Sequence, residues 1–518
     1  MKKKILWVDD EIDQLQAHIL FLKEKGYDVT PAANGDDAIN MVKEQAFDLV
    51  LLDEMMPGKD GLTTLEEIKD IQPALPVVMV TKSEEEHLME EAIGKKIDDY
   101  LTKPVNPSQI LSLTKKFLEA KKIMGNHLTQ QYIKDFNRIS MMLSGPMNWK
   151  DWLDLGLTLA RRDIEIDNFP DLGLKQTVEG QDREANLEFG RYIDRNYPTW
   201  MQSEDRPTLS VDIIRKYVAP HLMDTTYPVV FIVIDCMRLD QWLIIEELLN
   251  EYYNINRDLY YSILPTATPF SRNAIFSGLF PDSFSKLIPD SFKPGDSESS
   301  LNRHESQFLE QQLVRLKLKF KTDHKYVKIL EQAEGENLLK KLDNYLNTPM
   351  LSIVYNFIDM LAHGRSESEI LQEIAPDESA FRSLMKSWFL HSPLYTILRE
   401  LSSKKCTIVI TTDHGSILGT KGTVAYGRKD TSTNLRYKYG DNLNCDEKHA
   451  ILLKKPEKYH LPYFTGHTTY LFALEDYYFV YPTNFHEYQR YYQNSFQHGG
   501  ISIQEMVLPV ATLKPKNA

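Results

Sequence analysis

Residues 407–415 read TIVITTDHG, in which an apolar, β-branched run leads into an aspartate and a histidine side by side. Two further apolar runs also lead to an aspartate: PVVFIVID ends at Asp235, and LSIVYNFID ends at Asp359. Continuous apolar runs are typical of parallel strands buried on both faces, and the polar groups of such sheets gather beyond the carboxyl ends of the strands. The three runs therefore predict an α/β fold with a parallel sheet and an acidic crevice.

Histidines accompany these aspartates. His414 directly follows Asp413, and His363 follows Asp359 by four residues, a step that places both side chains on one face of a helix. His498 lies in FQHGG, where two glycines allow the backbone to turn closely beneath a site. With 14 histidines in the chain, any one of them is more often a surface or core residue than a ligand. Their repeated pairing with strand-end aspartates nevertheless indicates a metal site.

The segment LPTATPFSRNAIFSGLFPD contains the candidate nucleophile, Thr268. Thr268 precedes Pro269 at the start of a predicted helix, so its hydroxyl is expected to cap that helix. A helix N-terminus also favours anions, and a coordinated hydroxyl there would become a nucleophile toward a phosphate. Ser271 is a second hydroxyl within one turn, and the sequence leaves open which of the two reacts.

The first 120 residues show a second set of strand-end polar groups. The apolar runs ILWV, DVTPA, FDLVLLD, LPVVMVT and DDYLTKP alternate with amphipathic stretches, which predicts a parallel sheet with helices on both faces. The polar residues at the strand ends are Asp9, Asp10, Asp53, Thr81 and Lys103. Each acid alone could simply cap a helix. Together, converging carboxylates repel one another unless a hard cation such as Mg²⁺ neutralises them.

The motifs VDDE, LLDEMMPGKDG, MVTKS and YLTKP resemble the receiver domain of two-component response regulators, over residues 1–122. The resemblance implies that a sensor histidine kinase phosphorylates Asp53 and that Mg²⁺ is held by Asp9, Asp10 and Asp53. It also implies that Thr81, Tyr100 and Lys103 respond to the phosphoryl group. The stretch GKKIDDYLTKP departs from the family pattern before its tyrosine, which leaves the local loop and docking face open.

The middle of the chain, residues 123–205, is polar and helical in pattern. Its apolar positions, at three-to-four spacing, include Ile133, Phe136, Ile139 and Leu143, which predicts a helical bundle. The expected breaks between helices are 145–146, 168–173 and 197–198. Trp149, Trp152 and Trp200 are expected in the core. The stretch has no basic recognition helix, so we expect a spacer or dimerisation element and no duplex DNA-binding domain.

The last segment, residues 206–518, resembles the alkaline phosphatase superfamily, especially its nucleotide pyrophosphatase/phosphodiesterase and PglZ branches. The resemblance rests on DCMRLD, PTATPFSRNAIFSGLFP, DMLAH, TTDHG and QHGG, in that order. It implies two zinc ions, one held by Asp359, His363 and His498, the other by Asp235, Asp413, His414 and Thr268. Arg238 and Arg272 are candidate ligands of the substrate phosphate, because a guanidinium matches its oxygens in two-point contact. A sulfatase would need a C/S-x-P-x-R motif, which this segment lacks.

Length, charge and cysteines limit the class of protein. The 518 residues suffice for about three domains, and we find no run of about 18 apolar residues for a membrane span. The net charge of −14 argues against broad binding of duplex nucleic acid. The thiols Cys236, Cys406 and Cys445 form no CxxC pair, which fits a reducing compartment. We therefore expect a cytoplasmic protein whose metals are held by histidines and carboxylates.

The arrangement of the three segments resembles PorX-type response regulators of the Bacteroidetes. This resemblance implies a link to type IX secretion, a sensor kinase and a sigma factor, with phosphorylation controlling homodimerisation or access to the active site. Phe270, Phe276 and the basic segment 427–438 suggest a phosphodiesterase for nucleotides, short oligonucleotides or cyclic dinucleotides, although that segment could also be an ordinary solvated loop. The alternative is a non-enzymatic signalling hub with a structural zinc site, which binds a partner when phosphorylated.

Overall fold

The computed structural model describes all residues except 1, 83–96, 119, 170–172, 204, 225–226, 288–301, 319–323, 428–431, 433, 484 and 517–518. The part of the chain with the unusual GKKIDDYLTKP stretch lies partly outside the described residues. The chain forms two compact units, Met1–Gln131 and Tyr132–Ala518. None of the described helices is long and apolar enough to cross a membrane.

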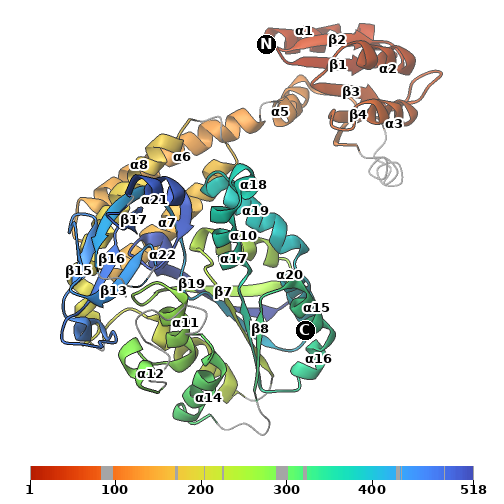
Figure 1. Ribbon diagram of the computed structural model, residues 1–518. Helices are drawn as coiled ribbons and strands as arrows, with labels where there is room; N and C mark the ends of the chain where they lie inside the picture. The colour runs from red at the N-terminus through yellow and green to blue at the C-terminus, as the bar shows by residue number, and fades with distance from the viewer. Residues whose placement is uncertain are drawn as a thin grey trace. The chain divides into compact units, whose positions relative to one another are not determined.

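The unit Met1–Gln131 is built on a five-stranded parallel sheet with the order β2-β1-β3-β4-β5. Its elements are β1 Lys4–Val8, α1 Gln16–Glu24, β2 Asp28–Ala32, α2 Gly35–Glu44, β3 Leu49–Asp53, α3 Gly61–Ile71, β4 Val77–Thr81, β5 Asp99–Thr102 and α5 Pro107–Leu118. Leu6 and Val8 of β1 pack with α2 and α3, whereas Ile5 and Trp7 pack with α1 and α5. Helices therefore cover both faces of the sheet, which confirms the predicted doubly wound fold (Figure 1).

Three long helices follow the first sheet. They are α6 Ala120–Leu143, α7 Trp149–Asp167 and α8 Lys175–Trp200. The helical prediction is confirmed, and so are the breaks near 145–146 and 168–173. The predicted break at 197–198 is wrong, because α8 continues through Pro198. Tyr197 and Trp200 are buried there, and their packing outweighs the hydrogen bond that proline cannot donate.

Many described apolar residues of these helices belong to the core of the second unit. Trp152 and Trp200 are buried in it, Trp149 packs against it, and Ile139 is fully buried. This confirms the core role expected for the tryptophans. Ile133 behaves differently, with 53% of its surface exposed.

The unit Tyr132–Ala518 contains a six-stranded sheet with the order β7-β19-β10-β6-β9-β8. The strands are β6 Val229–Ile234, β7 Tyr253–Tyr261, β8 Lys325–Ile329, β9 Met350–Tyr355, β10 Thr407–Thr411 and β19 Val507–Pro515. The four strands β10, β6, β9 and β8 are parallel, and β19 is antiparallel to both of its neighbours. The carboxyl ends of β6, β9 and β10 therefore meet at one edge, as the three apolar runs predict.

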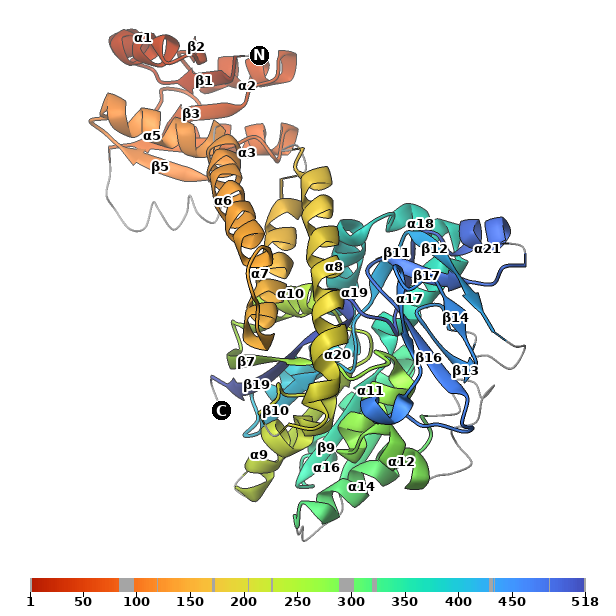
Figure 2. The ribbon, with the colours of Figure 1, turned by 90° about the vertical axis from the view of Figure 1, so that its left-hand side faces the viewer.

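Two cores sandwich this sheet. Val229, Phe231 and Val233 of β6 belong to a core that includes residues of α7 and α8, while Val230 and Ile232 belong to the other. Figure 2 shows α7 and α8 side by side. The helices of this part are α9 Ala219–Met223, α10 Leu239–Leu249, α11 Thr268–Ser277, α12 Pro281–Leu287, α14 Glu305–Arg315, α15 Gln332–Lys340, α16 Leu342–Tyr345, α17 Phe357–Glu367, α18 Glu369–Ile374, α19 Glu378–His391 and α20 Pro393–Leu401. The complete burial of β6 explains its continuous apolar sequence.

Small sheets complete the unit. They comprise β11 Ile417–Gly419, β12 Lys421–Tyr426, β13 Tyr437–Asp441, β14 Asn444–Cys445, β15 Ala450–Leu453, β16 Thr468–Ala473, β17 Tyr477–Val480 and β18 Ser495–Gln497, with helices α21 Phe485–Tyr492 and α22 Ile503–Met506. Strand β18 pairs with β11 and packs against α17. This pairing brings His498, which follows β18, to the edge where β6, β9 and β10 end.

A buried charge cluster joins α7 to α10 and α19. Arg382 of α19 donates to Asp167 at the end of α7 at 2.7 Å and to Asp240 of α10 at 2.8 Å. Arg238 donates to the same Asp240 at 2.9 Å and to Glu378 at 2.8 Å. Since a buried charge is costly without a partner, these contacts hold α7, α10 and α19 together.

Candidate metal centre

The first group of ligand atoms, which we call the outer group, comprises Asp359, His363 and His498. Asp359 lies in the first turn of α17, and His363 follows one turn later on the same face, as the four-residue step predicts. Nε2 of His363 lies 3.4 Å from Oδ1 of Asp359, and Nε2 of His498 lies 3.6 Å from the same oxygen. The two imidazole nitrogens are 3.4 Å apart. The His363 side chain is 47% exposed, so the group opens to solvent.

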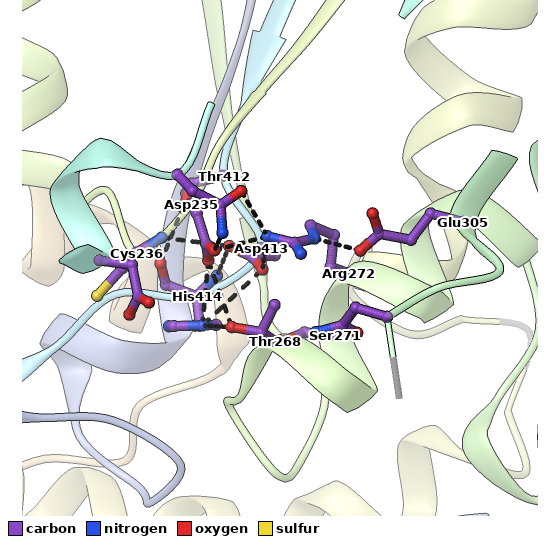
Figure 3. Close-up of polar contacts among 12 residues, drawn as sticks. Asp235, Cys236, Thr268, Ser271, Arg272, Glu305, Thr412, Asp413 and His414 are labelled. Atoms are coloured by element: carbon purple, nitrogen blue, oxygen red, sulfur yellow. Dashed lines mark hydrogen bonds and ion pairs between the residues drawn. The ribbon is translucent and has the colours of Figure 1, made fainter. Parts of the chain in front are cut away.

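The second group, which we call the inner group, comprises Asp235, Asp413 and His414, all fully buried (Figure 3). Asp235 follows β6, and the other two follow β10, its parallel neighbour. Nε2 of His414 lies 3.6 Å from Oδ1 of Asp235 and 3.8 Å from Oδ2 of Asp413. Cys236 has a φ of 64°, a left-handed turn that allows its amide to donate to Asp413 Oδ1 at 3.3 Å.

The orientation of the His414 ring follows from its hydrogen bonds. Nδ1 lies 3.0 Å from the carbonyl oxygen of Gly415, and a carbonyl only accepts, so Nδ1 carries the proton. Burial lowers the pKa of His414, which favours the neutral ring. Nε2 therefore keeps a lone pair directed at the inner group, the state that a metal ligand requires.

Thr268 completes the inner group. Its Oγ1 lies 3.0 Å from His414 Nε2 and 3.4 Å from Asp235 Oδ1. The expectation that Thr268 caps α11 is wrong by one residue, because Ala267 is the extended N-cap and Thr268 is the first helical residue. The hydroxyl is thus available to the inner group. Ser271 instead donates to the carbonyl of Ala267 at 2.8 Å, a bond within its own helix.

Both groups fit a tetrahedral metal ion. Ligands at 2.0–2.1 Å from a zinc ion lie about 3.3 Å from one another. The three separations of the outer group are 3.4, 3.4 and 3.6 Å, and those among Thr268, His414 and Asp235 are 3.0, 3.4 and 3.6 Å. Oδ2 of Asp413 is buried and accepts no hydrogen bond from the described residues. A mixed set of nitrogen and carboxylate donors suits zinc.

The two groups are neighbours. The rings of His414 and His498 stack with centroids 4.2 Å apart. Burial raises the pKa of Asp413 well above its usual value, and the charge of Asp235 acts in the same direction. Burial also acts to raise the pKa of Asp359, but a hydrogen bond from His363 and the charge of His498 outweigh it and hold that pKa low. The inner carboxylates therefore favour a cation between them.

Neither arginine of the sequence prediction points a free guanidinium at this centre. Arg238 is buried in the charge cluster with Asp240 and Glu378. Arg272 is buried between Glu305, at 2.5 Å from Nε, and Asp235 Oδ2, at 2.6 Å from Nη1. We therefore do not propose these two arginines as ligands of the substrate phosphate. Arg272 acts on the centre through Asp235.

The first unit brings its candidate residues together at the ends of β1, β3, β4 and β5. Oxygens of Asp9, Asp10 and Asp53 lie within 4.8 Å of one another. Lys103 Nζ lies 2.8 Å from Asp9 and 3.0 Å from Asp53. Burial raises the pKa of Asp53, while the hydrogen bond and charge of Lys103 oppose that rise. Thr81 ends β4 and is buried, and Tyr100 on β5 is 43% exposed.

Family models match three consecutive segments of the chain. A model described as the BREX system PglZ alkaline phosphatase-like domain matches residues 213–513, more than half of the chain. The chain belongs to the PglZ family. Ahead of the PglZ region, a response regulator receiver domain matches residues 5–115 and a PorX response regulator linker domain matches residues 122–201. The chain is thus a response regulator with an alkaline phosphatase-like effector, and both families generally use divalent metals.

Solved structures resemble the receiver. A CheY-like receiver domain protein from Methanospirillum hungatei JF-1 is 29% identical over 23% of this chain and 96% of its own, with a TM-score of 0.23. Chemotaxis protein CheY4 of Vibrio cholerae is 27% identical over 23% and 100%, with a TM-score of 0.22. A two-component response regulator from Clostridium difficile is 30% identical over 23% and 97%, with a TM-score of 0.22.

Sequence reasoning missed two residues of the PglZ region. One contacts the inner group directly, and the other acts on it through Arg272. Asn356 donates to Asp235 Oδ2 at 2.8 Å, and Glu305 holds Arg272. Asn356 follows β9 immediately, so the rule that polar groups gather at strand ends would have found it. Glu305 lies on α14, and no pattern in the sequence points to it.

The sequence suggests that Phe270, Phe276 and the segment 427–438 contact the substrate. In the structure of the PglZ region, the described side chains among them are mostly buried. Phe270 and Phe276 are buried, Phe270 against Tyr437 and Phe276 against Phe231, so they cannot stack a base. Residues 428–431 and 433 of the segment 427–438 lie outside the described residues. Its Arg436 is fully buried and paired with Glu505 at 2.5 Å. Residues 436–438 are therefore buried, whereas Gly427 is exposed.

Lys438 of the PglZ region gives a test of this burial. Burial lowers the pKa of Lys438 to about 8, and Nζ donates to the carbonyls of Ser432 and Asn434. Above pH 8 the folded protein releases a proton that the unfolded chain keeps until about pH 10.4, so this lysine destabilises the fold most below pH 8 and progressively less above it. We expect the free energy of unfolding of wild type, relative to Lys438→Met, to rise by roughly 3 kcal/mol from pH 7 to 10.5.

Denaturant unfolding at several pH values measures this difference. The same substitution at the exposed Lys448 is the control and should leave the pH profile unchanged. A profile of Lys438→Met that stays parallel to wild type contradicts the burial of this lysine.

Proposed function

We propose that the protein is a phosphorylation-responsive regulator whose PglZ region is a two-zinc phosphodiesterase. The observation that carries the proposal is the hydroxyl of Thr268, which lies within 3.4 Å of two inner-group ligands while the outer group adjoins them. A nucleophile at the N-terminus of α11, beside two ligand groups, suits an in-line attack on phosphorus.

Each residue of the centre would have a distinct role. The outer group, Asp359, His363 and His498, would hold one zinc ion, and Asp235, Asp413 and His414 would hold the other. Bound there, the two ions would hold the attacking and phosphoryl oxygens and lower the pKa of the hydroxyl. The hydroxyl of Thr268 would lose its proton to solvent and attack phosphorus, the alcohol of the ester would leave, and water would then release the phosphoryl group from Thr268. The amides at the start of α11 would face the developing charge.

The ion pairs of Arg238 and Arg272 favour a diester over a monoester. A monoester phosphoryl group carries a further negative charge, which needs a cation beyond the metals. Arg238 and Arg272 are each paired with two carboxylates, so neither supplies that charge. A diester monoanion needs no such group, and the solvent-open outer group leaves room for a second substituent.

Exposed aromatic rings on α21 support a base-containing substrate. Helix α21 packs on β12 and β17 and leads through β18 to His498. On it, Tyr488 is 42% and Tyr491 is 62% exposed. Exposed rings stack nucleobases without regard to sequence. Because the chain carries a net charge of −14, we propose nucleotides or short oligonucleotides rather than long nucleic acids.

Comparing esters tests this function. We expect faster turnover of bis-p-nitrophenyl phosphate than of p-nitrophenyl phosphate, because the diester matches the charge of the site. Tyr491→Ala should raise KM for a short oligonucleotide about 5- to 50-fold and leave bis-p-nitrophenyl phosphate unaffected. Tyr227→Ala, at an exposed tyrosine before β6, is the control. Preference for the monoester contradicts the diester proposal, and an inactive protein that binds a partner with its metals in place supports the signalling hub.

We further propose that Mg²⁺ and a sensor histidine kinase act on Asp53 and that phosphorylation drives homodimerisation, with type IX secretion and a sigma factor as the context. A receiver signals most simply by changing a subunit interface. Beryllofluoride with Mg²⁺ should therefore increase the sedimentation coefficient of wild type but not of Asp53→Ala. Equal profiles with and without beryllofluoride in wild type contradict the dimer.

A further inference from the structure

We propose that Asn356 is a positioning residue that ties the inner and outer groups together and sets the affinity of the inner group for its metal. The inference rests on the proposed two-metal function. The two oxygens of Asp235 have different partners. Oδ1 faces Thr268 Oγ1 at 3.4 Å and His414 Nε2 at 3.6 Å. Oδ2 accepts from Asn356 Nδ2 at 2.8 Å and Arg272 Nη1 at 2.6 Å.

This division fixes the carboxylate of Asp235. Two donors on Oδ2 prevent the group from rotating, so Oδ1 alone is presented to the inner group. The donors come from different elements, Asn356 from the residue after β9 and Arg272 from α11. Arg272 is itself held by Glu305, which also accepts from the Tyr326 hydroxyl. The orientation of Asp235 is thus set from two directions.

Asn356 has a second role in the outer group. It is the N-cap of α17, and its carbonyl accepts from the amide of Met360 at 3.1 Å. Its backbone therefore starts the helix that carries Asp359 and His363, while its side chain holds Asp235. Within the described residues no side chain caps the helix, because the Asn356 side chain is turned toward Asp235, with Nδ2 donating to Asp235 Oδ2 and Oδ1 accepting from Arg272 Nη1 at 3.5 Å. One residue thereby relates the position of one ligand group to that of the other.

The consequence is a selective change in metal affinity. Outer-shell partners of metal ligands typically contribute 10- to 100-fold to affinity. Asn356→Leu keeps a side chain of similar size but removes the donor, so Asp235 Oδ2 loses one of its two partners. We expect zinc to bind the inner group about 10- to 100-fold more weakly, with the outer group nearly unchanged.

The experiment titrates each group separately in the full chain, by competition with a chromophoric zinc chelator. The inner group is measured in a His363→Ala background and the outer group in an Asp413→Asn background, each with and without Asn356→Leu. Arg272→Lys, which keeps the charge but cannot reach both carboxylates in the same way, should weaken the inner group similarly. The control is Asn344→Leu, at an exposed residue of α16, which precedes β9.

Melting of the metal-free proteins separates positioning from folding. Metal-free Asn356→Leu should melt close to wild type, but the rise in Tm on adding zinc should be smaller. Inner-group affinity that is unchanged in Asn356→Leu overturns the inference, and so does an equal loss at both groups. Wild type that retains zinc at neither group overturns the proposed function together with this inference.

Discussion

Thr268→Val is expected to lower kcat for bis-p-nitrophenyl phosphate by at least about 10³-fold, because it removes the nucleophilic hydroxyl. Valine has almost the same shape as threonine, and residue 268 is 6% exposed, so the fold should be unaffected. Asp235, Asp413 and His414 remain in the variant, and zinc content should fall little. Steady-state kinetics and elemental analysis on the same preparation measure both effects.

Ser271→Ala is the matched control for this substitution. The Ser271 hydroxyl is fully buried and bonded to the Ala267 carbonyl, so its removal should change kcat only a few-fold. The reverse result, with Ser271→Ala inactive and Thr268→Val active, would assign the reaction to the other hydroxyl and require α11 to turn. Retained activity in both variants would place the nucleophile outside α11.

His498→Ala is expected to have the second largest effect. It removes one of three protein ligands of the outer group, so zinc content should fall from two ions per chain to one, and activity should fall by about 10²-fold or more. The inner group, which is fully buried, should keep its ion. Elemental analysis after dialysis against a weak chelator measures the loss.

His486→Ala, at an exposed histidine of α21, controls for the loss of an imidazole from the same part of the chain. It should retain both ions and full activity. Two ions in His498→Ala, or none in wild type, would contradict the assignment of the outer group.

Sequence reasoning found the site residues that lie in a recognisable local sequence pattern. Asp235 and Asp413 each follow an apolar run, and the step from Asp359 to His363 has the period of a helix, so local pattern alone placed them at strand ends and on one helix face. The same logic predicted the parallel sheet of the first unit and the parallel strands β6, β9 and β10 of the second. These features depend on interactions within a few residues.

Other features depend on which distant residues pack against a side chain. A local sequence pattern does not contain this information. Arg272 and Lys438 have the sequence surroundings of substrate-binding groups, yet Glu305 pairs with the first, and loop carbonyls surround the second. The position of Phe276 near Thr268 in the sequence predicts a substrate contact, but Phe231 and Tyr326 pack against its ring. His498 was a candidate by motif. Its approach to His363 requires the pairing of β18 with β11.

The charge cluster that joins α7 to α10 and α19 determines where this chain could be truncated or fused to another protein. Removing the helices before residue 206 would take away Asp167 and leave Arg382 buried with fewer partners, a loss that typically costs about 3–5 kcal/mol. Trp152 and Trp200 would be lost from the core at the same time. An exchange of regulatory modules between proteins is therefore expected to succeed when the joint lies near residue 131, within α6, and to yield insoluble chains when it lies after α8.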